Sequence, residues 1–156
     1  AEANARELLG TLGYFTPRLV LQLRDTPGAK TPHDVLVRVD KTGTKLIPGD
    51  RVTIRIELRT DRDLDYVHLK DQRASGLEPV EALSGYKWQG GLGYYQSIRD
   101  AGMHFFFDHI APGTYVFEYE LKVTHAGDFS NGLTTALCMY APEFSSHSEG
   151  VRVVVE

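Results

Sequence analysis

Cysteine is almost missing from this 156-residue sequence: Cys138 is the only one, which excludes an internal disulfide. Long apolar runs are missing as well, because no stretch approaches the 18 or so residues that a membrane-spanning helix needs. Clusters of Lys or Arg are also absent, and the 17 basic and 21 acidic residues give a formal net charge of -4. Because binding to a phosphate backbone depends on clustered cations, we expect neither nucleic acid nor an anionic membrane surface as a partner.

The rest of the composition predicts one globular domain. Hydrophobic residues make up 42% of the chain and charged residues 24%, an ordinary balance. Residues 1–16 predict a leader, a linker or a short helix, which Gly10 and Gly13 would end. Residues 17–156 predict a single domain, long enough to close a core without a disulfide or a metal.

Alternation of apolar and polar residues dominates the sequence after Pro17. It is clearest in residues 51–59 and returns in residues 115–124, each time after a Pro-Gly turn. A strand with one dry and one wet face belongs to an antiparallel sheet that packs on one side. Shorter runs predict further strands at 18–24, 34–40, 65–70, 94–100, 104–109, 133–140 and 151–156. No long helical period separates them, so we predict an all-β fold: an antiparallel β-sandwich of immunoglobulin or fibronectin type, with its strand order open.

One acidic segment resembles the start of a calcium loop. Asp61, Asp63 and Asp65 are spaced two apart, as in that loop. However, the sixth position is Tyr66 rather than Gly, and the twelfth is Gln72 rather than Glu. The segment therefore predicts a solvated turn between two strands.

Other candidate catalytic motifs are also incomplete. The six histidines and Cys138 show no zinc-ligand spacing, and Cys138 lies in an alternating run where a small buried side chain is expected. Residues 146–149, Ser-His-Ser-Glu, are sequence neighbours, whereas a nucleophile, its base and the orienting group come from distant segments. We therefore predict no catalytic residues, no metal and no cofactor, and class the chain as a non-enzyme.

Aromatic residues are the most informative feature. Tyr86, Trp88, Tyr94 and Tyr95 flank a glycine-rich loop, residues 90–93. Rings around such a loop are typical of protein–protein contacts, because they offer large area at low entropic cost. They are equally typical of a sandwich core, and for Trp88 and Tyr94 both interpretations stay open.

The alternation of side chains along a strand also predicts which face two other groups of aromatic side chains occupy. At least one of the three rings in residues 105–107 must face away from its neighbours, and we expect Phe106 and Phe117 in the core. His104 and His109 are five residues apart, so on a strand they point to opposite faces.

Several phrases resemble those of one family, in the same order along the chain. They are residues 46–50 (LIPGD), 63–71 (DLDYVHLKD), 74–80 (ASGLEPV), 107–115 (FDHIAPGTY), 125–129 (HAGDF), 139–143 (MYAPE) and 147–150 (HSEG). Together they are similar to the C-terminal macroglobulin-like domain of bacterial α2-macroglobulins, over roughly residues 45–156. Residues 86–89 (YKWQ) and 93–95 (GYY) are most similar to the forms in Bacteroidetes-type members.

The resemblance implies a domain of a large protease-trapping protein. In that family a Cys-Gln thioester in a separate domain couples to the attacking protease, and aromatic side chains of the C-terminal domain help to keep water from it. The implied partners are the thioester domain of the same chain and, through the parent protein, target proteases. The implied location is the periplasm or the cell surface, with a lipid anchor elsewhere in the parent. Trp88, Tyr94, Tyr95 and Tyr140 are the candidates for the interface or for thioester shielding.

A second interpretation belongs to a different class. The same rings could make a carbohydrate-binding or adhesion module that uses the loop of Trp88 and Tyr94 as its platform. If the domain shields the thioester, its rings cover a neighbouring domain in the parent protein. If it is a carbohydrate-binding or adhesion module, its rings form one exposed patch.

Overall fold

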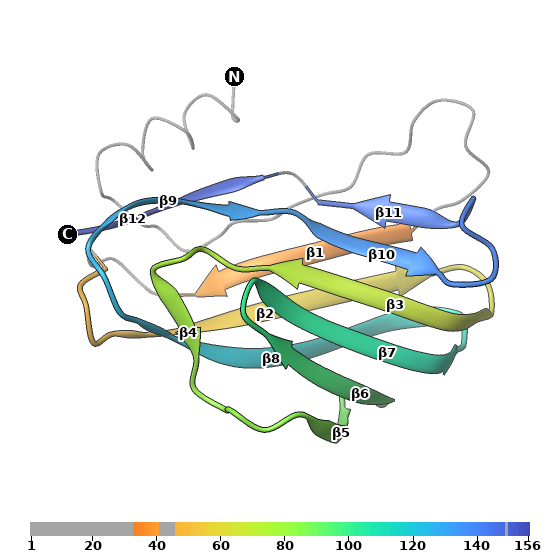
Figure 1. Ribbon diagram of the computed structural model, residues 1–156. Coiled ribbons are helices and arrows are strands. Elements are labelled where there is room, and N and C mark those ends of the chain that lie inside the picture. The colour runs from red at the N-terminus through yellow and green to blue at the C-terminus, as the bar shows by residue number, and fades with distance from the viewer. Residues whose placement is uncertain (1–32, 41–45, 149) are drawn as a thin grey trace.

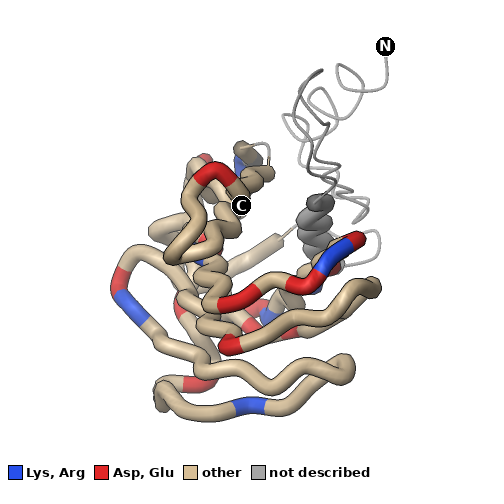
Figure 2. The backbone as a smooth tube through the Cα atoms, turned by 90° about the vertical axis from the view of Figure 1, so that its right-hand side faces the viewer, with Lys and Arg blue, Asp and Glu red and all other residues tan. Residues whose placement is uncertain are grey.

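The computed structural model describes residues 33–40, 46–148 and 150–156 (Figure 1). The predicted leader at residues 1–16 and the predicted strand at residues 18–24 lie outside these described residues. Within them, no helix is long and apolar enough to cross a membrane. Figure 2 marks the Lys and Arg positions of the described chain, which are scattered along the backbone rather than gathered in one place.

Two antiparallel sheets make up the body of the protein. The four-stranded sheet has the order β1 (His33–Asp40), β2 (Arg51–Thr60), β8 (Gly113–Val123), β4 (Leu77–Pro79). The six-stranded sheet has the order β11 (Ser145–His147), β10 (Thr134–Cys138), β3 (Leu64–Gln72), β7 (Gly102–Ile110), β6 (Leu92–Arg99), β5 (Gly85–Gln89). A third, two-stranded sheet joins β12 (Val151–Val155) to β9 (Gly127–Gly132). The prediction of an all-β antiparallel sandwich is confirmed.

Alternation was a good guide to the long strands and a poor one to the short ones. The strands expected around residues 34–40, 51–59, 65–70, 94–100, 104–109, 115–124 and 151–156 are present, with ends within a few residues of the expected ones. The strand expected at 133–140 ends at Cys138, because a turn follows in which the Ala141 amide donates to the Cys138 carbonyl at 3.2 Å. Strands β4, β5, β9 and β11 have three to six residues each and were not predicted, since so few residues carry no readable alternation.

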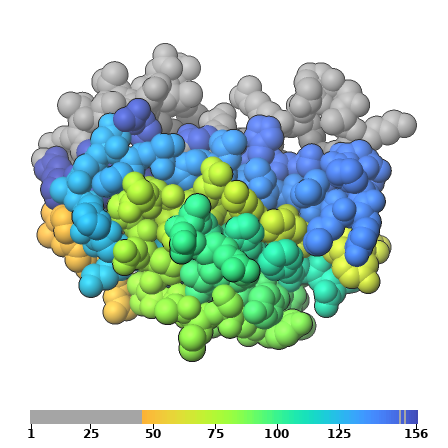
Figure 3. All heavy atoms as spheres, in the orientation of Figure 1, coloured from red at the N-terminus to blue at the C-terminus, as the bar shows by residue number. Residues whose placement is uncertain are grey.

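The core lies between the two large sheets. Inward side chains of β2 and β8 meet those of β3, β6 and β7, and burial follows every second residue of the long strands. Aromatic rings fill its centre: Phe105 and Phe117 meet edge to face at 5.1 Å between ring centroids, and Phe107 lies 5.8 Å from Phe117. In Figure 1 the six-stranded sheet lies in front of the four-stranded sheet, so Figure 3 looks onto its outer face.

One buried carboxylate joins the two sheets. Asp71 on β3 is 1% exposed and accepts hydrogen bonds from the Tyr119 hydroxyl on β8 and the Thr134 hydroxyl on β10, both at 2.6 Å. Burial raises the pKa of Asp71 to about 6, although both hydrogen bonds act in the opposite direction. The folded state therefore binds a proton more tightly at Asp71 than the unfolded chain does.

Asp71 should make the domain less stable as pH rises from about 4 to about 6. The pKa is raised in the folded state, so the proton is lost from the unfolded chain first and stability falls through this window. In urea unfolding, we expect the stability of Asp71→Asn relative to wild type to increase between pH 4 and pH 7 by on the order of 3 kcal/mol. The exposed carboxylate Asp108, replaced by Asn, is the control for loss of one charge. Parallel pH curves for Asp71→Asn and wild type would contradict the assignment.

Candidate functional site: an aromatic face on the six-stranded sheet

The two outer faces of the sandwich differ in chemistry. The outer face of β2 and β8 carries exposed ion pairs, Arg51 with Glu120 at 3.4 Å and Arg55 with Glu118 at 3.7 Å. Such exposed pairs contribute about 0–1 kcal/mol and suit a hydrated surface. The outer face of the six-stranded sheet carries aromatic side chains instead, and this face is the candidate site.

A row of rings crosses four strands of that face. By register, Tyr86 on β5 lies opposite Tyr95 on β6, Tyr95 opposite Phe106 on β7, and Phe106 opposite His68 on β3. The Tyr86 and Tyr95 rings meet at 5.1 Å with their planes 73° apart. The Phe106 and His68 rings are stacked at 4.6 Å with their planes 6° apart. Cross-strand aromatic pairs of this kind stabilise the sheet and also leave a continuous apolar strip at its surface.

Phe106 is therefore a correction to the core prediction. It is half-buried on the outer face, while Phe105 and Phe107 on either side of it are fully buried. The reason is the alternation along β7, which sends every second side chain outward. The prediction that one ring of the three faces away is confirmed, and Phe117 is in the core as expected.

The row ends at His68, and a second histidine, His104, packs against it. Nε2 of His68 lies 2.9 Å from Nδ1 of His104, and the two rings are stacked within 17° of parallel. Burial, followed by the charges of His104 and Lys70, lowers the pKa of His68. Burial, followed by Lys70 and Arg99, lowers the pKa of His104. The lowered pKa values favour the neutral form of both imidazoles, which suits a face that another surface can cover.

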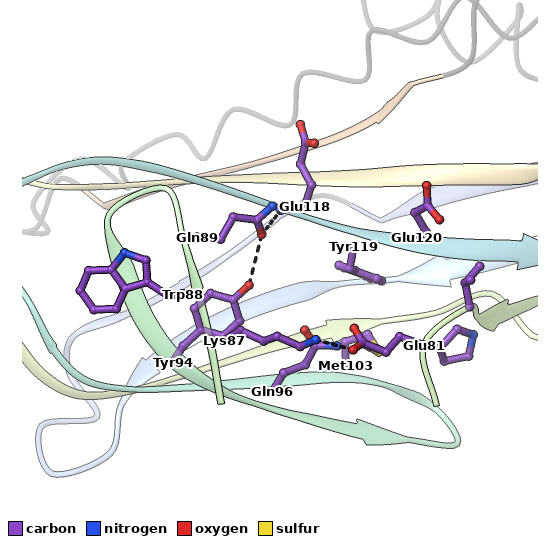
Figure 4. A pocket seen from close by; sticks show the side chains of 12 residues that line it. Glu81, Lys87, Trp88, Gln89, Tyr94, Gln96, Met103, Glu118, Tyr119 and Glu120 are labelled. Atoms are coloured by element: carbon purple, nitrogen blue, oxygen red, sulfur yellow. Dashed lines mark hydrogen bonds and ion pairs between the residues drawn. The ribbon is translucent and has the colours of Figure 1, made fainter. Parts of the chain in front are cut away.

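Trp88 sits at the free edge of the sheet, on the β5–β6 hairpin. Gly90 and Gly91 form its two-residue turn with φ of +61° and +84°, the left-handed conformation that such turns require. Trp88 is 78% exposed, and its ring packs over Gly93, where an added Cβ would lie 2.9 Å from the indole. Trp88 is also one of the residues that line a cavity beside the hairpin (Figure 4).

Tyr94 does not belong to this face. It is 4% exposed, and its ring packs against Phe105, Phe107 and Phe117 at 5.4 to 5.7 Å between centroids. Strand β6 alternates, so Tyr94 points into the core and Tyr95 points out. Tyr94 is therefore removed from the interface candidates, and Trp88, Tyr95 and Tyr140 are retained.

Tyr140 lies at a corner of the same sheet, on the far side of β7 from Trp88. It is 80% exposed and meets the ring of Tyr66 edge to face, at 5.1 Å and 87°. Met139 beside it is half exposed. Tyr66 was not singled out from the sequence, where it only marked a failed calcium loop. We call Tyr66, Met139 and Tyr140 the projecting corner.

A cavity of about 360 Å³ lies on the inner side of the β5–β6 hairpin (Figure 4). The Lys87 ammonium pairs with the Glu81 carboxylate across it, and the Tyr94 hydroxyl donates to Oε1 of Gln89 at 3.2 Å. Nε2 of Gln96 is buried in its lining, and none of the residues that the structure describes forms a hydrogen bond with it. The described lining contains no Cys, Ser or His, and its charged side chains are Glu81, Lys87, Glu118 and Glu120.

His109 and Cys138 are two further titratable groups whose pKa is shifted by their surroundings. His109 pairs with Asp65 at 2.8 Å and Asp63 at 3.3 Å on the surface, and its hydrogen bond to Asp65 is the main cause of its raised pKa. Cys138 is buried, and burial raises its thiol pKa, which makes it a poor nucleophile. Across the described ranges, no group of three or more His, Cys, Asp or Glu side chains could hold a metal ion.

The fold and the site together define an all-β sandwich with an aromatic outer face on its six-stranded sheet. The family model for the bacterial α2-macroglobulin MG10 domain matches residues 25–143. The chain belongs to this bacterial α2-macroglobulin MG10 domain family.

Individual relatives are distant and much longer. The chain is 26% identical over 118 residues to the α2-macroglobulin homolog of Nostoc sp. (strain PCC 7120), covering 69% of this chain and 6% of that protein. It is 24% identical over 130 residues to circularly permutated Ras protein 2 of Dictyostelium discoideum, covering 81% of this chain and 3% of that protein. The chain thus spans a small fraction of the curated relatives it matches.

Solved structures agree on the fold. Salmonella α2-macroglobulin reacted with methylamine superimposes with a TM-score of 0.63 at 16% identity, over 81% of this chain and 9% of that chain. Trypsin-activated α2-macroglobulin from Escherichia coli gives a TM-score of 0.64 at 12% identity, over 78% of this chain and 10% of that chain. The special similarity to Bacteroidetes-type members stays a prediction.

The hairpin that carries Trp88 should depend more on Gly90 than on Gly91. Both have left-handed φ, so Ala at either position costs about 1–2 kcal/mol. An added Cβ on Gly90 would also lie 2.0 Å from the Val116 carbonyl oxygen. A Cβ added on Gly91 would meet no heavy atom of another described residue within 4 Å, its chain neighbours aside. We expect Gly90→Ala to lower the free energy of unfolding clearly more than Gly91→Ala in urea titration. Equal losses for the two variants would show that the hairpin does not press against β8.

Proposed function

We propose that this domain packs through the outer face of its six-stranded sheet onto the thioester-bearing domain of the same long chain, and shields the thioester from water. The parent is then an α2-macroglobulin-like inhibitor that traps proteases, and this domain is its non-catalytic cover. We propose further that residues 17–156 act as its single C-terminal macroglobulin-like unit. The parent would act in the periplasm or at the cell surface, held by a lipid anchor outside this chain.

The aromatic face is the observation that carries this proposal. A thioester hydrolyses unless it is desolvated, so its cover needs apolar rings on a surface that can also separate. Three of the four candidate residues lie on or at the corner of one sheet, while the opposite outer face is charged. The matched relatives are far longer than this chain, which supports a neighbouring domain of the same long chain as the partner. Two of the similar structures are described as reacted with methylamine and activated by trypsin, as a trap with a reactive thioester would be.

A carbohydrate-binding role for the hairpin is the second candidate. Tyr86 and Trp88 are both highly exposed on the same side of β5, at the free edge of the sheet. However, the Tyr86 and Tyr95 planes are 73° apart, so these two rings do not offer a flat platform for a sugar ring. The rings therefore form an uneven surface, which favours a folded protein as the partner over a sugar ring.

The proposal is tested in the full-length parent by the release of thioester thiol at neutral pH. We expect Trp88→Ala, Tyr95→Ala and Tyr140→Ala to release thiol faster than wild type, by about tenfold for the residue that contributes most to the contact. They should also form less covalent protease adduct on a denaturing gel, and methylamine should abolish the adduct in every form.

The matched control is Leu83→Ala, a large exposed apolar residue between β4 and β5 that lies outside the aromatic face. It should behave as wild type. Equal thiol release from all variants would overturn the shielding role. The absence of a releasable thiol and of an adduct in every form, wild type included, would overturn the thioester trap and move the carbohydrate-binding role to first place.

A further inference from the structure

Tyr66 has a backbone conformation that its side chain does not favour. Its φ is +52°, and it is the one non-glycine residue with positive φ among those that the structure describes. A Cβ crowds the following carbonyl in this conformation, which is why glycine, asparagine or aspartate usually occupies it. Residues held in such a state against their preference cluster at functional sites.

The local fold needs the conformation but not the tyrosine. Leu64 and Val67 on β3 are both buried although they are three residues apart, and the left-handed residue between them interrupts the alternation. Strand β7 shows the same interruption opposite, where Phe107 and Ile110 are buried. Glycine at position 66 would allow this path with no Cβ penalty. Packing into the core does not explain a large aromatic residue there, because Tyr66 is 52% exposed.

Tyr66 instead makes two contacts with the turn that follows β10. Its carbonyl accepts a hydrogen bond from the Met139 amide at 2.9 Å, which continues the β3–β10 ladder past its last pair. Its ring meets Tyr140 edge to face at 5.1 Å, so each exposed ring limits the orientations open to the other. Fixing two rings before contact lowers the entropic cost of docking.

We infer that Tyr66 is a positioning and contact residue of the docking surface: its strained backbone holds Met139 and Tyr140 in place and presents a second ring beside them. The inference rests on the proposed function and deepens it by naming where the contact is made. All three residues of the projecting corner are at least half exposed, and they offer two phenol hydroxyls and one thioether. The projecting corner fits an apolar recess on the thioester-bearing domain.

Three substitutions at position 66 separate the ring from the backbone, with Tyr140→Ala as the reference. All are made in the full-length parent, with thiol release as the measure of docking and hydrogen–deuterium exchange of residues 64–72 as the measure of local stability. Tyr66→Phe keeps the ring and should match wild type in thiol release within about twofold. Tyr66→Ala and Tyr66→Gly both lose the ring and should release thiol about tenfold faster. Tyr66→Gly should protect β3 amides better than Tyr66→Ala, because it alone relieves the backbone strain.

The outcomes are distinct. In one outcome, thiol release changes in parallel with hydrogen–deuterium exchange: Tyr66→Gly releases thiol as slowly as wild type and Tyr66→Ala releases it faster. This would show that Tyr66 has a purely structural role, and it would overturn the inference. Normal release from all three variants with rapid release from Tyr140→Ala would also overturn it, while leaving the proposed function intact. Normal release from Tyr140→Ala as well would count against the proposed function itself.

Discussion

The packing of two pleated sheets against each other is the constraint on which the rest of this structure depends. Strand β7 must send Phe105 and Phe107 into the core, where they meet Phe117 of the other sheet. Because successive side chains point to opposite faces, Phe106 is then forced outward. The same rule buries Tyr94 and exposes Tyr95. The aromatic surface is thus the reverse side of an aromatic core, built from neighbouring residues of the same strands.

Sequence reasoning recovered what alternation encodes and little else. The long strands and the sandwich followed from period two, and the phrases shared with one family agree with the family match. Which of two adjacent tyrosines faces inward could not be read, because a shift of one residue exchanges them and both fit a strand. The structure fixes that choice through the turn at Gly90 and Gly91 and the pairing of β5 with β6.

Two features of the site had no sequence signal at all. The left-handed conformation of Tyr66 was invisible, since tyrosine is an unusual residue for it and the acidic residues nearby drew attention to a calcium loop. The bond between Asp71 and Tyr119 links positions 48 residues apart on different sheets, which no local pattern can indicate. Both features depend on the tertiary structure, that is, on which segments the fold brings together.

The place of Trp88 has a practical consequence for anyone who studies this domain by spectroscopy. It is the only tryptophan in the chain, and 78% of it is open to solvent in the folded state. Its emission is therefore nearly insensitive to whether the core is formed, since the indole is in water before and after unfolding. Its emission wavelength and its quenching instead report contact at the edge of the six-stranded sheet. The chain carries an intrinsic optical probe of surface occupancy, and its folding must be followed by other means.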